Sequence, residues 1–334
     1  MADQMSAKAL PFYGHPVVKA PTLSRLAKEG VVFENAYCNS PLCGPSRTSM
    51  MTGLLPSKAG GYDNAHDFSA ALPTFAHYLR LGGYRTCLSG KMHFTGPDQL
   101  HGYEERLTTD IYPSDFGWAP NWGEPDAKVT FQDMTNVLET GPCLRSLQID
   151  YDDDVATKAC RWLDDRPRAE STQPFMLTVS FTSPHDPYGA RPKYWDLYTD
   201  DEIDLPAVPP IPVKDMDAHS KRIHGHYLFG KAEINDDVMR RARHGYYASI
   251  EYIDAKVAAS PVNHFVDNLQ FTIQSVSKTN IADQRETWRI TSLENGETRG
   301  SIDRNQDGNK AGNRNRYSAQ GHIGRCDRTW DKAE

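Results

Sequence analysis

The chain contains no apolar run near the length that a membrane span requires. Its N-terminal segment, residues 1–5, lacks both the basic start and the apolar stretch of a secretory signal. A basic excess is also missing, because the net charge is -7 and proteins that bind nucleic acid usually carry positive charge. We therefore expect no membrane partner, no nucleic-acid partner and, by default, a cytoplasmic location.

Paired cysteines are absent as well. The six cysteines are scattered along the chain, with no CxxC pair and no neighbouring histidines at metal-ligand spacing. This pattern indicates neither a zinc site nor a disulfide framework. Five of the six are interpreted as small, mostly buried side chains in a reducing compartment. Cys43 is the exception.

Residues 21–257 alternate between helix-like and strand-like segments, which is typical of an α/β domain with a mostly parallel sheet flanked by helices. The expected helices span 22–29, 74–80, 152–163 and 233–257, and the expected strands span 31–33, 84–88 and 175–181. After residue 257 the pattern changes. Short alternating patterns over 265–290 suggest strands, whereas the Asn-, Arg-, Asp- and Gly-rich segment 305–316 has too few apolar side chains to offset the entropy of ordering. We expect a domain over 1–257 and a poorly ordered tail over 258–334.

The segment that points to chemistry runs from Cys43 to Gly53, with the sequence CGPSRTSMMTG. Pro45 suits the first turn of a helix and Gly53 suits the position after its end. Cys43 is therefore predicted at a helix N-terminus, where free N–H groups and the helix dipole favour an anion. Arg47 adds a guanidinium that matches sulfate, phosphate or carboxylate. A nucleophile beside such a cradle is what sulfuryl or phosphoryl transfer requires. The alternative is an inert buried cysteine in a capping loop.

The same run carries the pattern Cys-x-Pro-Ser-Arg followed by Thr-Gly, and through it the chain resembles type I sulfatases of the alkaline-phosphatase-like superfamily. Further runs are similar to choline-sulfatases in particular, and they are residues 13–18, 74–83, 87–93, 96–110, 111–118 and 183–188. The resemblance implies that a separate maturation enzyme oxidises Cys43 to formylglycine. It also implies that the hydrated aldehyde attacks sulfur and then releases sulfate by collapsing back to the aldehyde.

The resemblance also assigns roles to other residues. Lys91 and His93 match a pair that contacts sulfate and the nucleophile. His185 follows the strand expected over 175–181 and matches a histidine that protonates the leaving alcohol, at the strand end where α/β sheets place their sites. Without the nearby motif, each histidine would be interpreted as a surface or packing residue.

A metal and a substrate are implied in the same way. Asp3 and Gln4, together with Cys43, match ligands of a calcium ion, for which hard oxygen ligands are suited. The strand that should precede Asp3 and Gln4 is missing, so we expect them to be a frayed terminus. Aromatic faces hold quaternary ammonium groups well, and the aromatic residues of one Gly- and Pro-rich loop include Tyr112, Phe116, Trp118 and Trp122. The resemblance places Trp118 near choline, Phe116 belongs to the same group, and Asp115 would add charge complementarity. Otherwise, these aromatics simply pack the loop.

The pattern breaks after residue 257. The turn that supplies the remaining calcium ligands in the family has no counterpart, since Asp267-Asn268 follows the helix too soon and lacks the glycine. The core is therefore expected to be incomplete and truncated at both ends, and 258–334 to be unrelated sequence, as a shifted frame would produce.

Three functions follow from these observations. The first is hydrolysis of choline-O-sulfate to choline and sulfate. The second is a non-catalytic remnant of a sulfatase. The third is a phosphoester or phosphonate-ester hydrolase that shares the motif. The sequence leaves the formation of a homo-oligomer open.

Overall fold

The computed structural model describes residues 1–119, 121, 123–124, 134–166, 172–228, 234–259, 292–294 and 297–299. Its α-helices are α1 Pro21–Glu29, α2 Cys43–Thr52, α3 Pro56–Ala59, α4 Phe75–Leu81, α5 Thr135–Leu138, α6 Leu147–Asp165, α7 Pro192–Trp195, α8 Ala218–Leu228 and α9 Asp236–Ala259. The strands are β1 Arg85–Gly90, β2 Glu105–Arg106, β3 Phe175–Ser180, β4 Ser292–Glu294 and β5 Glu297–Arg299. In the described part of the chain, no helix has both the length and the apolar character needed to cross a membrane.

The central sheet is parallel and has the strand order β2-β1-β3. β1 pairs with β3 along its whole length, from Arg85 opposite Phe175 to Gly90 opposite Ser180. β1 is buried from its second residue to its last, as expected for a parallel strand covered on both faces. The predicted α/β class with a parallel sheet is therefore confirmed.

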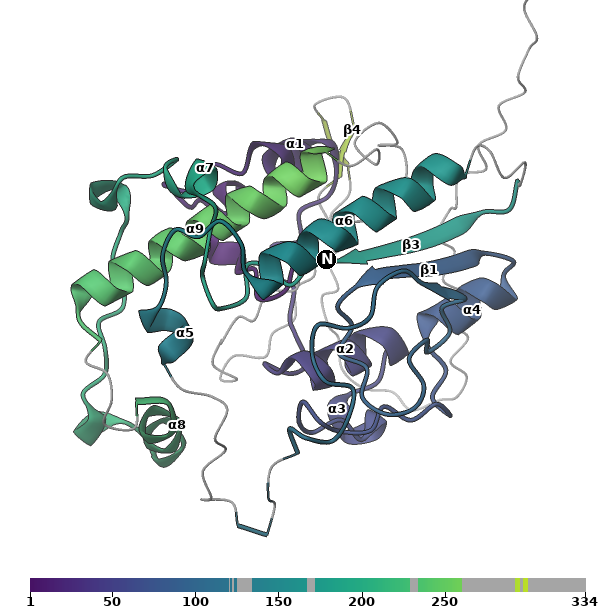
Figure 1. Cartoon of the computed structure of the whole chain (residues 1–334), viewed down its shortest axis with the longest axis horizontal. Helices are drawn as coiled ribbons and strands as arrows, with labels where there is room; N and C mark the ends of the chain where they lie inside the picture. The colour runs from purple at the N-terminus through teal and green to yellow at the C-terminus, as the bar shows by residue number, and fades with distance from the viewer. Residues whose placement is uncertain are drawn as a thin grey trace, which may run out of the picture.

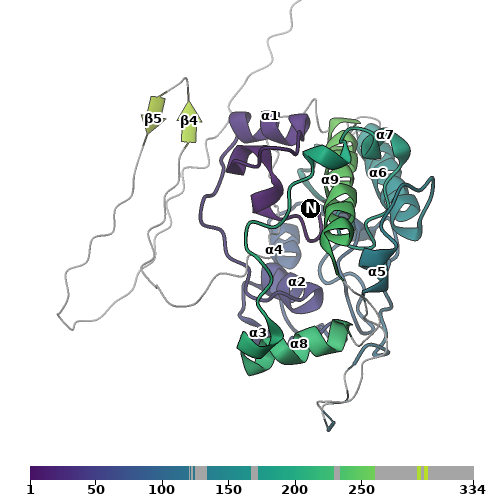
Figure 2. The same ribbon diagram turned by 90° about the vertical axis from the view of Figure 1, so that its left-hand side faces the viewer.

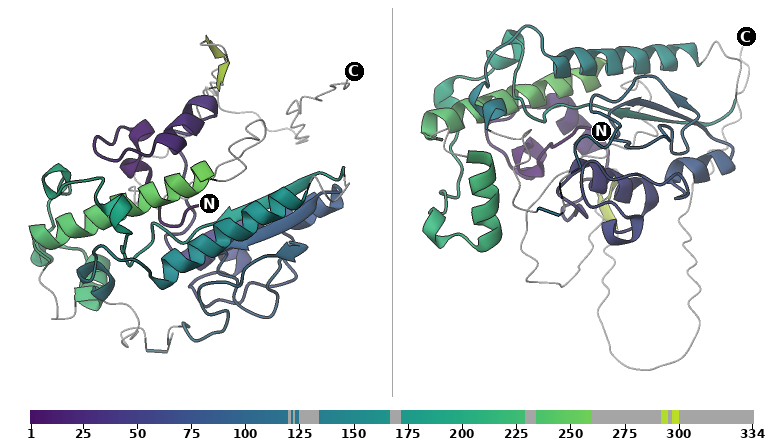
Figure 3. Two further views of the ribbon diagram at one scale, coloured as in Figure 1. Left: turned by 45° about the horizontal axis from the view of Figure 1, so that its top comes forward. Right: turned by 60° about the horizontal axis from the view of Figure 1, so that its bottom comes forward.

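Helices cover both faces of this sheet. Figure 1 and the right-hand view of Figure 3 place α6 on one side of β1 and β3, and α2 and α4 on the other. Burial of apolar side chains on these faces supplies the main stabilisation. The core under α2 and α4 consists of Met51, Phe68, Ala76, Leu88, Met92, Phe94 and Tyr103.

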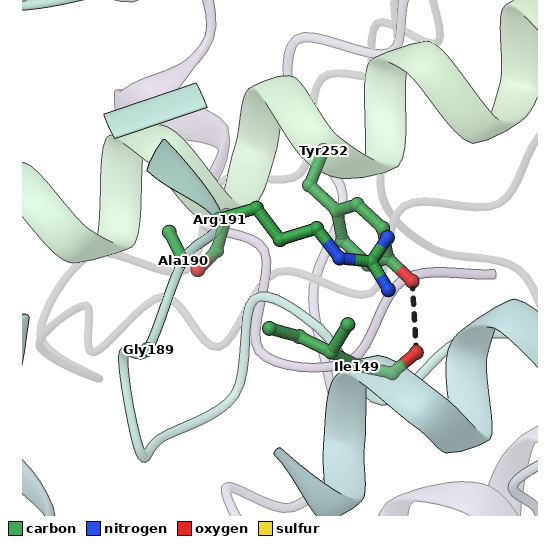
Figure 4. A pocket seen from close by; sticks show the side chains of 6 residues that line it. Ile149, Gly189, Ala190, Arg191 and Tyr252 are labelled. Atoms are coloured by element: carbon green, nitrogen blue, oxygen red, sulfur yellow. Dashed lines mark hydrogen bonds between the residues drawn. The ribbon is translucent and has the colours of Figure 1, made fainter. Parts of the chain in front are cut away.

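The long helix α9 lies beside α6 and organises the N-terminal part of the chain (Figure 2). Figure 4 shows one contact between the two helices, in which the Tyr252 hydroxyl donates to the Ile149 carbonyl at 3.2 Å. Asp254 of α9 accepts hydrogen bonds from the backbone N–H groups of Thr22 and Leu23 at 3.1 and 2.7 Å. These are N-terminal N–H groups of α1, which have no partner inside their own helix. The carboxylate therefore caps a helix that lies far away in the sequence.

The structure confirms the four predicted helices and two of the three predicted strands. The strand expected over 31–33 is wrong, because that segment has no regular structure and the side chains of Val31 and Phe33 are 42% and 51% exposed. A short apolar run forms a strand only where a neighbouring strand can pair with it and a core can cover it. The strands expected over 265–290 and the disorder expected over 305–316 lie outside the described residues.

Candidate active site

Cys43 is the first residue of α2, as predicted from the sequence. Leu42 before it is extended, and Gly53 closes the helix with φ 71°, in the left-handed region that glycine adopts without strain. The N–H of Gly44 donates to Asn64 Oδ1 at 2.9 Å, which fixes the start of the helix. The Cys43 side chain is half-buried, with its sulfur directed toward charged groups from two other parts of the chain.

Asp3 is the first of these groups. Its carboxylate oxygens lie 3.6 and 3.8 Å from Cys43 Sγ, and the residue is only 4% exposed. The expectation of a frayed terminus is therefore wrong. Phe181, just after β3, donates its N–H to the carbonyl of Met1 at 3.0 Å and accepts from the N–H of Asp3 at 3.2 Å. This parallel pairing beside β3 orders the segment and places Asp3 at the C-terminal edge of the sheet.

Lys91 is the second group. It follows β1, is fully buried, forms an ion pair with Asp3, and lies with its Nζ 3.8 Å from Cys43 Sγ. Burial alone would raise the pKa of Asp3, but the Lys91 ammonium and the Arg47 guanidinium outweigh it and hold that pKa well below its ordinary value. Burial likewise opposes the charge on Lys91, but Asp3 outweighs it and raises the pKa of Lys91. Both groups are therefore charged over the physiological range.

Arg47, one turn into α2, contacts Asp3, which in turn contacts Cys43. Its Nη2 lies 3.5 Å from Asp3 Oδ1, and its Nη1 donates to the Lys91 carbonyl and, at 3.1 Å, to Ser180 Oγ. The residue is 1% exposed, so the guanidinium forms a buried support that joins α2, β1 and β3. Within the described residues, Arg47 Nε and Nη2 have no hydrogen-bond acceptor.

His185 lies in the loop after β3, and the structure brings it to the same place. One of its ring nitrogens, an Asp3 oxygen and Cys43 Sγ all lie within 4.8 Å of one another. The ring Nδ1 is 2.7 Å from the carbonyl oxygen of Asp186. Since a carbonyl only accepts, Nδ1 carries the hydrogen in this contact and Nε2 is the nitrogen available to a substrate.

His93 packs against two aromatic rings, one of which also lies near Lys91 and His185. Its Nε2 is 2.8 Å from the Asn64 carbonyl, and its buried Nδ1 has no partner among the described residues. The Trp118 and Tyr112 rings lie 5.8 and 5.4 Å from the His93 ring, measured between centroids. Lys91 Nζ lies 4.1 Å from the centre of the Tyr112 ring.

Tyr112 has a larger part in this site than the sequence indicated. It touches Lys91, His93 and Trp118, and its ring centre is 6.0 Å from that of His185. Burial raises the pKa of its hydroxyl to about 12, so the group stays neutral. The sequence placed Tyr112 only in an aromatic loop. Its central position depends on how that loop folds back over β1, for which the sequence carries no local signal.

Three other predicted residues are placed differently. Asp115 accepts a hydrogen bond from the N–H of Gly117 in its own loop at 3.0 Å, and Phe116 is 55% exposed. Gln4 follows Asp3 directly, but its side chain hydrogen-bonds Tyr188 and its carbonyl accepts from Tyr246. None of these contacts joins the three residues to the Cys43 group. Trp122 lies outside the described residues.

Asp3, Cys43 and His185 offer ligand atoms close enough together to hold a metal ion. Calcium takes six to eight oxygen ligands, and Asp3 supplies a buried, ionised carboxylate next to position 43. An oxygen-bearing side chain at position 43 would add a second kind of donor. Gln4 is engaged elsewhere, so of the three predicted ligands the structure brings Asp3 and Cys43 together.

Comparison with known proteins supplies a family. The Sulfatase family model matches residues 1–265. The chain is 47% identical over 262 residues to a choline-sulfatase of Rhizobium meliloti, an alignment that covers 77% of this chain and 51% of that protein. It is 28% identical over 282 residues to an arylsulfatase of Clostridium perfringens, covering 77% and 56% of the two chains. The chain thus spans about half the length of the curated relatives it matches.

Among solved structures, the phosphonate monoester hydrolase of Agrobacterium radiobacter matches with a TM-score of 0.57 and 21% identity, covering 77% of this chain and 56% of that one. At this identity the likeness establishes the fold alone, and it agrees with the alkaline-phosphatase-like architecture expected from the sequence.

Proposed function

Because the chain belongs to the sulfatase family, we propose that it hydrolyses a sulfate ester with a nucleophile derived from Cys43, and that choline-O-sulfate is the substrate. The observation that carries this proposal is the convergence of Cys43, Lys91 and His185 within a few ångströms at the C-terminal edge of a parallel sheet. The 47% identity to a choline-sulfatase favours choline among the sulfate esters. Residues 1–257 would form the catalytic domain, separate from 258–334.

Sulfatases of this family generally use a formylglycine and a divalent metal. Oxidation of Cys43 by a formylglycine-generating enzyme, which would be a transient partner, gives position 43 a hydrated aldehyde whose hydroxyl is the nucleophile toward sulfur. Cys43 Sγ already lies 3.8 Å from Lys91 Nζ. A hydroxyl there would therefore have a cation beside it to stabilise negative charge.

The remaining side chains would divide the work between charge and proton transfer. Lys91 and His93 would bind the sulfate oxygens, and Arg47 would hold Lys91 and Asp3 in place from behind. His185 would carry a proton on Nε2 and give it to the oxygen of the leaving alcohol as the sulfur–oxygen bond breaks. That nitrogen is available because Nδ1 is occupied by the Asp186 carbonyl.

Asp3 would hold the calcium ion, with position 43 as a second ligand and Gln4 if its side chain turned from Tyr188. The ion would supply positive charge next to the sulfate. A readout that does not depend on activity is the melting temperature, which should rise on adding calcium to the wild type and stay constant in Asp3→Asn.

Aromatic faces would select the choline end of the substrate. Tyr112 and Trp118, with ring centres 5.0 Å apart, lie against Lys91 and His93 and offer π surfaces close to the reacting group. A trimethylammonium group over such a face gains on the order of 1–2 kcal/mol when desolvated. Asp115 and Phe116, which lie in the same loop as Trp118, are further candidates for the choline site.

The test begins with the chain co-expressed with a formylglycine-generating enzyme and with mass spectrometry of the peptide that contains position 43. Purified protein is then assayed on choline sulfate, 4-nitrophenyl sulfate and a phosphate diester, with and without calcium, beside Cys43→Ala. We expect formylglycine at position 43, turnover of choline sulfate by the wild type and no turnover by Cys43→Ala. A matured residue without any turnover would establish the non-catalytic remnant, and preference for the diester would establish a phosphoesterase.

A further inference from the structure

The first turns of α6 contain two buried polar residues that contact the loop carrying His185. Gln148 and Asp152 are four residues apart and therefore lie on the same face of the helix, one turn above the other. They are 8% and 0% exposed. The residues that they contact lie on either side of His185 in the sequence, at 182, 183 and 186.

Asp152 holds the segment before His185. Its two carboxylate oxygens accept hydrogen bonds from the backbone N–H groups of Thr182 and Ser183, at 2.7 and 2.8 Å. The Thr182 carbonyl in turn accepts from the N–H of His185 at 3.1 Å. One buried carboxylate thus fixes two consecutive peptide groups, and a turn hydrogen bond connects them to the histidine.

Gln148 holds the segment after His185. Its Nε2 donates to the carbonyl oxygen of Asp186 at 2.6 Å, which is the same oxygen that lies 2.7 Å from His185 Nδ1. The Gln148 amide therefore fixes one of two acceptors near Nδ1, the other being the Asp186 carboxylate oxygen Oδ1 at 3.3 Å. On the outer side, Asn136 Nδ2 donates to the Asp186 carboxylate at 2.9 Å.

We propose that Gln148 and Asp152 are positioning residues, which set the orientation and the tautomer of His185 so that Nε2 faces the ester oxygen. This proposal rests on the proposed function, in which His185 protonates the leaving alcohol. The two residues act only through His185. Removing them should therefore reduce the delivery of the proton more than the binding of the sulfate.

Leaving groups of different basicity separate this role from general support of the fold. Nitrophenolate leaves without needing a proton, whereas an alkoxide such as that of choline needs one. Gln148→Met, which keeps the side-chain length but loses the donor, should lower kcat for choline sulfate on the order of tenfold and change kcat for 4-nitrophenyl sulfate little. Asp152→Asn should act in the same direction. One of the two backbone N–H groups would then face an amide NH₂, which cannot accept its hydrogen bond.

The matched control is Asp153→Asn. Asp153 follows Asp152 in α6, and its carboxylate pairs with Arg191 and Lys256 instead of with the His185 loop. This variant should leave the ratio of the two kcat values unchanged. If Asp152→Asn fails to fold, Gln148→Met alone tests the proposal. Its readout that does not depend on activity is ¹⁵N NMR of the His185 imidazole, which should show a smaller fraction of the Nδ1–H tautomer than in the wild type.

A wild type that hydrolyses neither sulfate would refute the proposed function. Turnover by the wild type with equal losses on both esters in Gln148→Met, or an unchanged His185 tautomer, would overturn the positioning role alone.

Discussion

Replacing Asp3 by Asn removes the anion that compensates two buried cations. Lys91 and Arg47 are 0% and 1% exposed, and both contact the Asp3 carboxylate. Breaking a buried ion pair by deleting one partner costs about 3–5 kcal/mol, because the remaining charge stays buried without compensation. With two cations affected, we expect Asp3→Asn to lose about 3–5 kcal/mol of unfolding free energy at neutral pH.

The sign of the pH dependence follows from the pKa of Asp3. Burial would raise that pKa, but Lys91 and Arg47 hold it below the ordinary value of 3.8. The unfolded chain therefore takes up the proton first as the pH falls. The contribution of Asp3 is fully present above pH 3.8 and is lost progressively below it. Asp3→Asn should show a smaller loss of stability between neutral pH and pH 3 than the wild type.

The assay is urea unfolding of the calcium-free protein followed by tryptophan fluorescence, with Lys91→Met and the double variant completing a mutant cycle. The loss in the double variant should be smaller than the sum of the two single losses, because Lys91→Met removes one of the two cations that Asp3→Asn leaves uncompensated. The control is Asp201→Asn, which changes an exposed carboxylate of the 3-10 turn Asp200–Glu202. Its free energy of unfolding should stay within about 0.5 kcal/mol of that of the wild type. A loss below about 1 kcal/mol in Asp3→Asn, or strictly additive effects, would refute the reasoning.

Three further predictions address other parts of the molecule. Trp118→Ala should raise KM for choline sulfate on the order of tenfold, with KM for 4-nitrophenyl sulfate nearly unchanged, because one cation–π face is lost; steady-state kinetics on both esters measure this. Asp153→Asn should lose on the order of 1 kcal/mol at neutral pH and only a small part of that near pH 2, as judged by urea unfolding. The reason is that burial raises the Asp153 pKa but Arg191 and Lys256 outweigh it and lower it to about 2, so its contribution lasts above pH 3.8 and fades as the pH falls to 2. Glu251→Ala should lose about 2 kcal/mol in thermal or urea unfolding, because the N–H groups of Lys19 and Ala20 would lose their buried acceptor.

The sequence predicted those parts of the site whose geometry is local. Pro45 and Gly53 bound a helix by their own backbone preferences, so the place of Cys43 at its N-terminus followed from eleven consecutive residues. His185 was assigned from the resemblance to sulfatases, and its predicted place after the strand at 175–181 agrees with the position of β3. In both cases the signal and the structure lie in the same short segment.

The parts that the sequence did not predict depend on contacts between distant segments. The burial of Asp3 requires Phe181 to pair with the chain around it, and nothing near Asp3 indicates that partner. Gln148 and Asp152 appear in the sequence as ordinary polar residues in an amphipathic helix. Their contacts with the His185 loop exist only after α6 has packed on β3. The failed strand at 31–33 has the same origin, because a strand is defined by a neighbour that the local sequence does not specify.

The charge balance around Cys43 explains how two cations can be buried beside it. Lys91 and Arg47 contribute two positive charges and Asp3 removes one, which leaves a net charge of about +1 on these three side chains. An uncompensated buried charge is costly. Asp3 therefore stabilises the fold at this point, because its carboxylate allows two cations to be buried side by side.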